Sequence, residues 1–362
     1  MIMKRFAIVN ARRNSGAFTL IELLISVGVL ALLILVVSQL MNSATTVTRT
    51  GNKHIDTDTQ ARIVLDRMAV DFAKMLKRTD IDYFIKVPLG YKNPNSNGKG
   101  KKLKSGQLGN DQIAFFAGTP GYYPSGSQSP LSLVAYRIDD VPTSPTYLQL
   151  ERMGKGLLWN GVNNGTNPNS PYPIVFATGQ IDLSCTNKCP CSGTTGPWAG
   201  PWSAAICDDT ADSDYETIGP GVFRFEYYYL LKDGSITDAP RVTSAAVNWS
   251  PTDPIPLSAK LNAFSDVEAI AVVIAVIDPA SRALVYPDAL FNLMSDMADF
   301  KNAKGNGNPA KAIGDVENNW NLAVQSAAQT GKTSDNSAFP PAAASAVRIY
   351  NRYIDVRTLP NL

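Results

Sequence analysis

The chain has 362 residues, of which 44% are hydrophobic and 18% are charged, and its formal net charge is +2. Its first 17 residues hold four cations (Lys4, Arg5, Arg12 and Arg13) and no acid, so the rest of the chain carries a charge of −2. Nucleic-acid binding needs clustered Lys and Arg. The balance after residue 17 therefore argues against a nucleic-acid partner, and the length allows one large or two modest domains.

The most apolar stretch runs from Phe18 to Met41 and contains a single charge, Glu22. About 24 residues are enough for a helix to cross a hydrocarbon core, and the preceding cations place its amino end in the cytoplasm. A carboxylate inside an apolar span costs about 3 kcal/mol unless it finds a partner. Glu22 is therefore either functional or near enough to the end of the span to reach the headgroups.

A polar, threonine-rich stretch from Asn42 to Asp58 follows, and for it we expect a loosened or partly melted helix. From Ala61 to about Lys77 the pattern predicts an amphipathic helix with one face to bury. Its apolar side holds Val64, Leu65, Met68, Phe72, Met75 and Leu76, and its polar side holds Arg62, Asp66, Arg67, Asp71, Lys74 and Lys77. The alternative is a membrane anchor followed by a separate helix.

The rest of the chain predicts mainly strands, bounded by loops rich in Gly, Pro, Ser and Asn. We expect strands at 112–117, 131–138, 147–153, 173–178, 222–231, 266–277 and 346–356. Lys232-Asp233-Gly234 predicts a hairpin turn after the fifth of them. Two helical stretches are expected at about 288–300 and 309–328.

Four cysteines, Cys185, Cys189, Cys191 and Cys207, lie close together in an insert from Asp182 to Pro220. A chain exported across the membrane places them where disulfides persist, which favours two bridges without fixing the pairing. A zinc site is the alternative, although the usual C-x2-C spacing is absent. Free thiols are the third.

Two further groups are candidate sites. The acidic run Asp208, Asp209, Asp212, Asp214 and Glu216 offers oxygen ligands for calcium, but it does not match an EF-hand loop, and a solvated acidic loop is the simpler interpretation. His54 is the single histidine and falls in the polar stretch of the long helix. We therefore expect a surface histidine, no catalytic triad and no enzyme.

Residues Ala17-Phe18-Thr19-Leu20-Ile21-Glu22, after the basic leader, closely resemble the processing site of type IV prepilins and type II secretion pseudopilins. In that family a membrane peptidase cuts before a phenylalanine and methylates the new amine. The resemblance implies a cut between Ala17 and Phe18, with Phe18 N-methylated and Glu22 retained. The family usually has glycine before the cut, and here Gly16 lies one position earlier, so a cut after Gly16 stays open.

The resemblance implies a pilin-like α+β fold. It divides the chain into a leader (1–17), a long N-terminal helix (18–77, with its membrane half at 18–41 and its amphipathic half at 60–77) and a head (78–362). In this fold the helix packs on an antiparallel β-sheet head, here with the cysteine-containing insert at 182–220. The Asp-Arg-Met-Ala-x-Asp segment that begins at Asp66 and the terminal Val-Arg-x-Tyr-x-Arg strand that begins at Val347 resemble J-type minor pseudopilins. The run from Leu65 to Phe72 and the strand Asp111–Gly118 resemble the Verru/Chthon cassette protein C family.

The function that this resemblance implies is a minor pilin or pseudopilin subunit of a type IV pilus or type II secretion pseudopilus. Its implied partners are prepilin peptidase, other pilin subunits and an inner-membrane assembly platform. It would span the bacterial inner membrane once with its head in the periplasm, then enter a filament in which Glu22 pairs with the Phe18 amine of a neighbour. The alternatives are a filament-tip adhesin or DNA-uptake pilin that binds through Trp198 and Trp202, and an anchored extracytoplasmic enzyme.

Overall fold

The computed structural model describes residues 19–76, 109–120, 131–139, 142–156, 215–238, 267–305 and 307–356. The chain divides into two units, Met1–Asn52 and Lys53–Leu362. We call the second unit the head. The long helix α1 (Leu20–Ala73) belongs to both units, since its residues from Lys53 onward are part of the head.

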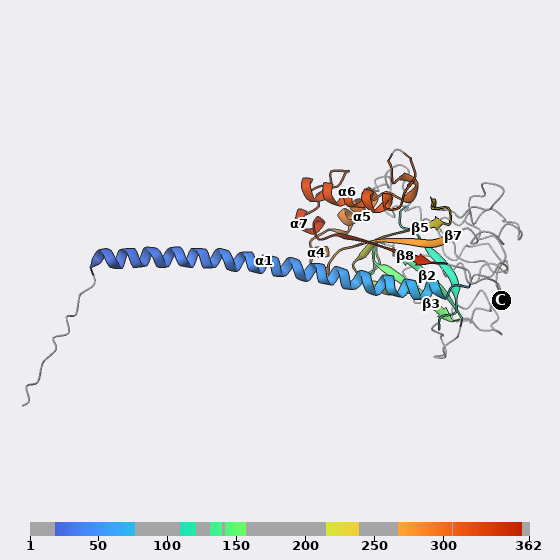
Figure 1. Ribbon diagram of the computed structural model, residues 1–362, viewed down its shortest axis with the longest axis horizontal. Helices are drawn as coiled ribbons and strands as arrows, with labels where there is room; N and C mark the ends of the chain where they lie inside the picture. The colour runs from blue at the N-terminus through green and yellow to red at the C-terminus, as the bar shows by residue number, and fades with distance from the viewer. Residues whose placement is uncertain are drawn as a thin grey trace, which may run out of the picture. The chain divides into compact units, whose positions relative to one another are not determined.

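The described residues of the head form two antiparallel four-stranded sheets and a set of helices (Figure 1). The first sheet has the order β1-β2-β3-β4, and the second has the order β6-β5-β7-β8. Their strands are β1 (Ile113–Ala117), β2 (Ser132–Ile138), β3 (Leu150–Gly156), β4 (Tyr215–Gly219), β5 (Val222–Leu231), β6 (Ile236–Thr237), β7 (Val267–Val276) and β8 (Arg348–Asp355). The helices are α4 (Pro279–Arg282), α5 (Pro287–Asp296), η1 (Phe300–Asn302), α6 (Asp315–Thr330) and α7 (Pro341–Ala344).

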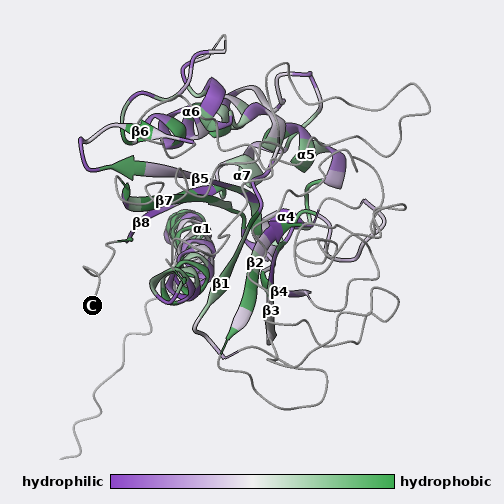
Figure 2. Cartoon of the chain, turned by 90° about the vertical axis from the view of Figure 1, so that its right-hand side faces the viewer, coloured by the Kyte–Doolittle hydropathy of each residue, from purple (hydrophilic) through white to green (hydrophobic). Residues whose placement is uncertain are grey.

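The C-terminal half of α1 lies between the two sheets, as Figure 2 shows end-on. On one side Phe72 stacks on Phe115 of β1 with ring centroids 4.9 Å apart. On the other, Tyr350 of β8 donates a hydrogen bond to Asp58. Helices α5 and α6 cover the opposite face of the second sheet. The head is thus layered around α1.

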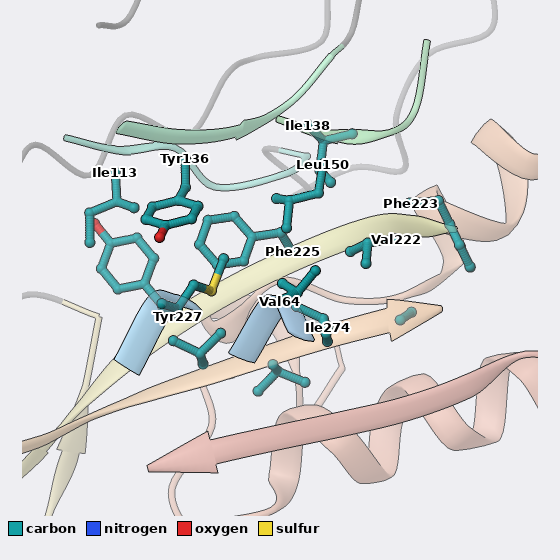
Figure 3. Packing of buried hydrophobic residues seen from close by; sticks show 14 of the residues in the cluster. Val64, Ile113, Tyr136, Ile138, Leu150, Val222, Phe223, Phe225, Tyr227 and Ile274 are labelled. Atoms are coloured by element: carbon teal, nitrogen blue, oxygen red, sulfur yellow. The ribbon is translucent and has the colours of Figure 1, made fainter. Parts of the chain in front are cut away.

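The apolar face of α1 forms part of one continuous core with both sheets. Every third or fourth residue from Ala61 to Met75 is buried, namely Ala61, Val64, Leu65, Met68, Phe72 and Met75. In Figure 3, Val64 lies among side chains of the first sheet, such as Leu150, and of the second sheet, such as Phe225 and Ile274. The predicted amphipathic periodicity therefore corresponds to the contacts that hold the helix to the head.

The turn between β4 and β5 packs directly against α1, and glycine makes this possible. A Cβ on Gly221 would lie 2.4 Å from the side-chain oxygen of Gln60 and 2.4 Å from the backbone oxygen of Ile277. Its amide instead donates a hydrogen bond to that Gln60 oxygen at 3.0 Å. The turn joins the two sheets, so this contact fixes both of them to the helix.

Most of the predicted elements are confirmed, with shifts of a few residues at their ends. The strands expected at 112–117, 131–138, 222–231, 266–277 and 346–356 correspond to β1, β2, β5, β7 and β8. The helical stretch at 288–300 becomes α5 and η1, and that at 309–328 becomes α6. The strand at 147–153 begins later, at Leu150, because Tyr147 and Leu148 form a turn in which Leu148 has φ 55°. The strand expected at 173–178 lies outside the described residues.

Three expectations need correction. The helix is not loosened between Asn42 and Asp58, because α1 runs through this stretch without a break. Asp71, placed on the polar side of the helix, is fully buried, because α1 is covered by sheets on two sides. The range 182–220 also contains β4, a strand of the first sheet that the sequence pattern did not indicate.

Candidate processing and assembly site

The start of α1 is closed by a reciprocal contact between Thr19 and Glu22. The Glu22 carboxylate accepts hydrogen bonds from the Thr19 amide and the Thr19 hydroxyl, both at 2.9 Å. The Thr19 hydroxyl oxygen in turn accepts from the Glu22 amide at 3.4 Å. This is a capping box, which satisfies amides that have no partner within a helix. Its signal in the sequence is Thr-x-x-Glu before an apolar run, which our sequence-based expectations did not include.

Gly16, Ala17 and Phe18, the residues of the predicted cleavage site, lie outside the described residues. Glu22 itself is placed four residues after Phe18, in the first turn of α1. Its carboxylate is exposed, and among the described residues its hydrogen bonds are to Thr19 at the start of its own helix. A charged group with this geometry is free to exchange a local hydrogen bond for an external cation.

No described part of the chain covers the apolar part of α1. All described side chains from Thr19 to Thr48 are exposed, including leucines, isoleucines and valines. By length and composition, α1 is the one helix among the described residues that is long and apolar enough to cross a membrane. Its apolar surface is too extensive for contact with water, which indicates lipid or other helices as its surroundings.

The threonines after the span are accommodated within the continuous helix. The hydroxyls of Thr45, Thr46 and Thr48 donate to the backbone oxygens of Met41, Asn42 and Ala44, four residues earlier, at 2.8–2.9 Å. Such bonds satisfy the hydroxyl within the helix and remove its competition with the backbone. This local pairing explains why weak helix formers do not interrupt α1.

The head end of α1 is held along β8 by polar contacts at alternate strand positions. Arg348 lies 2.9 Å from Nε2 of His54, Tyr350 donates to Asp58 at 2.5 Å, and Arg352 forms an ion pair with Asp66. Burial and the hydrogen bond to Asp58 raise the pKa of Tyr350 to about 12. His54 is half-buried and lies beside Arg348. An open groove of about 410 Å³ follows this seam between α1 and β8.

A buried ionic contact fixes the last turn of α1 to the first sheet. One oxygen of Asp71 accepts from Tyr136 of β2 at 2.5 Å and from Nε of Arg152 of β3 at 2.7 Å. Burial and the neighbouring Asp71 carboxylate raise the pKa of Tyr136 well above its ordinary value. Gly154, two residues along β3, leaves the space that the Arg152 guanidinium occupies. The sequence analysis missed this contact.

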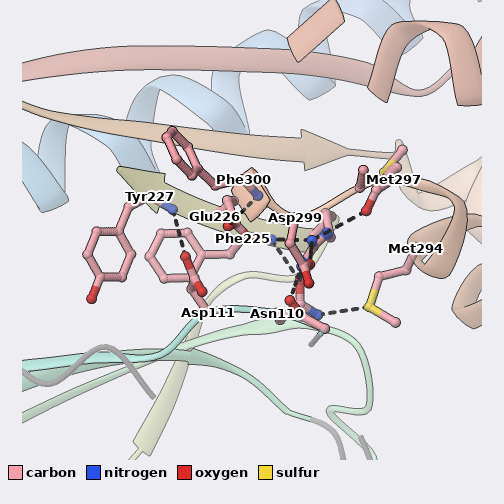
Figure 4. Close-up of polar contacts among 12 residues, drawn as sticks. Asn110, Asp111, Phe225, Glu226, Tyr227, Met294, Met297, Asp299 and Phe300 are labelled. Atoms are coloured by element: carbon pink, nitrogen blue, oxygen red, sulfur yellow. Dashed lines mark hydrogen bonds and ion pairs between the residues drawn. The ribbon is translucent and has the colours of Figure 1, made fainter. Parts of the chain in front are cut away.

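A second buried cluster, centred on Arg224, joins β5 to the C-terminal helices (Figure 4). The Arg224 guanidinium donates to Asp299 at 2.5 Å and to Glu226 at 3.3 Å. It also lies 5.1 Å from the ring of Trp320 of α6. Although burial opposes its charge, Asp299 and Glu226 raise the pKa of Arg224.

The same region caps the edge of β5 through side chains that precede β1. Asn110 and Asp111 accept hydrogen bonds from the amides of Phe225 at 2.8 Å and Tyr227 at 2.9 Å. Figure 4 shows both side chains pointing at the strand. Together with the Arg224 cluster, they connect the two sheets and the helical layer. These polar groups are bonded to one another and to the backbone, so their role is to hold the sheets and helices together.

The remaining candidate residues are mostly outside the described part of the chain. This holds for Cys185, Cys189, Cys191 and Cys207 and for Asp208, Asp209, Asp212 and Asp214 of the calcium candidate. Glu216 lies on β4 with an exposed carboxylate 3.9 Å from Arg152. Within the described residues, no group of three or more His, Cys, Asp or Glu side chains is positioned to hold a metal ion.

The comparisons with known proteins agree with the geometry of the N-terminal segment. Residues 12–38 match the family described as the prokaryotic N-terminal methylation motif. A comparison with curated proteins finds no match. The matched range covers the predicted cleavage site, the capping box and most of the apolar part of α1. The motif implies processing by prepilin peptidase and assembly with other pilins, and it points to a family of structural subunits. Residues 12–38 thus carry the N-terminal motif that is typical of type IV pilins and pseudopilins.

Proposed function

We propose that the chain is a minor pilin or pseudopilin subunit that prepilin peptidase processes for assembly into a type IV pilus or a type II secretion pseudopilus. One observation carries this proposal. Within the matched motif, an exposed apolar helix begins at a capping box whose acid, Glu22, is the single charge in the span. A membrane anchor alone does not need an acid at this position, whereas subunit pairing does.

The proposed chemistry is association between subunits. After cleavage, the Phe18 amine is a cation at the edge of the bilayer. The Glu22 carboxylate of a neighbouring subunit is an anion at the same depth in the bilayer. Each group is costly in an apolar environment alone, and pairing removes that cost for both. The capping box with Thr19 keeps Glu22 hydrogen-bonded before assembly, so the monomer is not left with an unsatisfied carboxylate.

The proposed location follows from the charge pattern and the single span. The four cations of the leader keep the amino end in the cytoplasm, so the head enters the periplasm of a bacterial inner membrane. The assembly platform of that membrane is then the proposed partner for extraction of α1. A head of about 300 residues is easier to place once at a filament end than to repeat along a tightly packed shaft, which supports a minor subunit of the J type.

The test is incorporation into sheared filaments. We expect the wild-type protein in the filament fraction only when prepilin peptidase is active. Glu22→Ala should remain in the membrane and be lost from filaments, whereas Asp56→Ala, which removes an exposed acid from the same helix, should be incorporated normally. Equal incorporation of the Glu22→Ala protein would overturn the proposed pairing.

A further inference from the structure

An exposed apolar patch lies on the head beside the part of α1 that joins it. It consists of Pro279, Ala280, Ala283, Leu284, Tyr286 and Pro287, all solvent-exposed, from α4 and the start of α5. Tyr286 is 82% exposed and Leu284 is 58% exposed. An aromatic and a large aliphatic side chain held this far into solvent within ten residues is unusual for a surface that meets only water.

The patch is held rigidly, so its exposure is a property of the fold. The Leu284 amide donates to the Ser281 backbone oxygen and the Val285 amide to that of Arg282, both at 3.1 Å. Between the two exposed residues, Val285 is buried in the core. Pro287 then begins α5 directly after Tyr286. A surface that is ordered in advance loses little conformational entropy when it binds.

The position of the patch along the chain identifies its partner. Lys53, the first residue of the head, donates to Ser281 of α4 at 2.9 Å, so the patch adjoins the point at which α1 joins the head. The apolar part of α1 ends at Met41, which is about 18 Å from Lys53 at 1.5 Å per helical residue. A span in the bilayer therefore keeps this patch close to the lipid surface at a high effective concentration.

We propose that the patch docks on the membrane surface while the subunit waits in the bilayer, with Tyr286 and Leu284 inserted among the lipid headgroups. The proposal rests on the proposed anchorage of α1 in a membrane. Tyrosine is enriched at this depth because its ring is apolar and its hydroxyl is polar. The Arg282 guanidinium is turned inward and donates to the backbone oxygens of Tyr147 and Leu148, so the patch meets lipid by its apolar side chains. Helix tilt provides the remaining reach. Docking holds the head against the membrane until assembly draws it away.

The experiment places a photoreactive p-benzoylphenylalanine at Leu284 or at Tyr286 in the full-length processed protein, reconstituted in phosphatidylglycerol–phosphatidylcholine nanodiscs. The matched control is the same residue at Leu322 of α6, which is 65% exposed and distant in sequence from the patch. We expect lipid adducts at 284 and 286 to exceed those at 322 by about tenfold, since insertion by apolar contact is local. The excess should persist at high salt, because burial of apolar surface is not screened.

Equal lipid labelling at 284, 286 and 322 would overturn the proposal, and so would adducts formed with protein in place of lipid. A Leu284→Ser, Tyr286→Ser double variant gives a second readout without a probe. Both side chains are exposed, so the head should fold normally, and protection of 279–288 from hydrogen exchange in nanodiscs should be lost. If the wild-type chain instead fails to remain in the bilayer at all, the proposed anchorage itself is wrong, which separates the two failures.

Discussion

Removal of the Asp71 carboxylate should release the last turn of α1 from the first sheet. In Asp71→Ala, Arg152 loses its bond of 2.7 Å and Tyr136 its bond of 2.5 Å, while both remain buried. Breaking a buried ion pair from one side costs about 3–5 kcal/mol, because the other charge is left without compensation. We expect the free energy of unfolding of the head to fall by this amount.

The assay is urea unfolding of the full-length protein in mild detergent, monitored by the near-ultraviolet circular dichroism of the aromatic core. The control is Asp66→Ala on the same helix, which removes an exposed ion pair with Arg352 and should cost less than about 1 kcal/mol. The triple variant Asp71→Leu, Arg152→Met, Tyr136→Phe should recover most of the loss, since apolar replacement of a whole buried pair is often neutral. Equal losses for Asp71→Ala and Asp66→Ala would refute the reasoning.

Two further perturbations test the packing and the ionisation of the head. Gly221→Ala should lower the free energy of unfolding by about 2 kcal/mol, because its Cβ would meet Gln60 and the backbone of Ile277. The control is Gly51→Ala on α1, where a Cβ would meet nothing within 4 Å, and it should stabilise the helix by about 1 kcal/mol. Equal free energies of unfolding for the two variants in urea would contradict the packing described at Gly221. The pKa values of Tyr136, Tyr227 and Tyr229 are raised by burial, so the stability that their neutral forms contribute is complete below about pH 10 and is lost as the pH rises further. Absorbance at alkaline pH should therefore show these phenols ionising together with unfolding, and their ionisation in a folded head would count against the burial described.

The sequence predicted the elements whose signal lies in a local repeat. The apolar run before Met41 and the three- and four-residue spacing from Val64 to Met75 led directly to α1, and the apolar strands became β5 and β7. The prepilin motif was indicated by resemblance, and residues 12–38 match it. By contrast, β4 is five residues long and only half-buried, so neither its length nor its pattern distinguishes it from a loop.

The polar scaffold depends on partners that are distant in sequence, which no local pattern reveals. The spacing of Asp71 predicts the polar face of the helix, yet Tyr136 and Arg152 of the first sheet contact it there. Arg224 and Glu226 offered a clearer signal, because charges at alternate positions of a strongly apolar strand point to one buried face. Their partner Asp299 lies more than seventy residues later.

The central claim is that the chain is processed as a prepilin, and the mature N-terminus tests it most directly. We would measure intact mass and N-terminal sequence of the membrane-bound protein from cells with active and with inactive prepilin peptidase. The account predicts a mature chain that begins at methylated Phe18 when the peptidase is active and an uncut leader when it is not. A leader that stays uncut in both strains, or a cut beyond Met41 that removes the apolar helix, would contradict it.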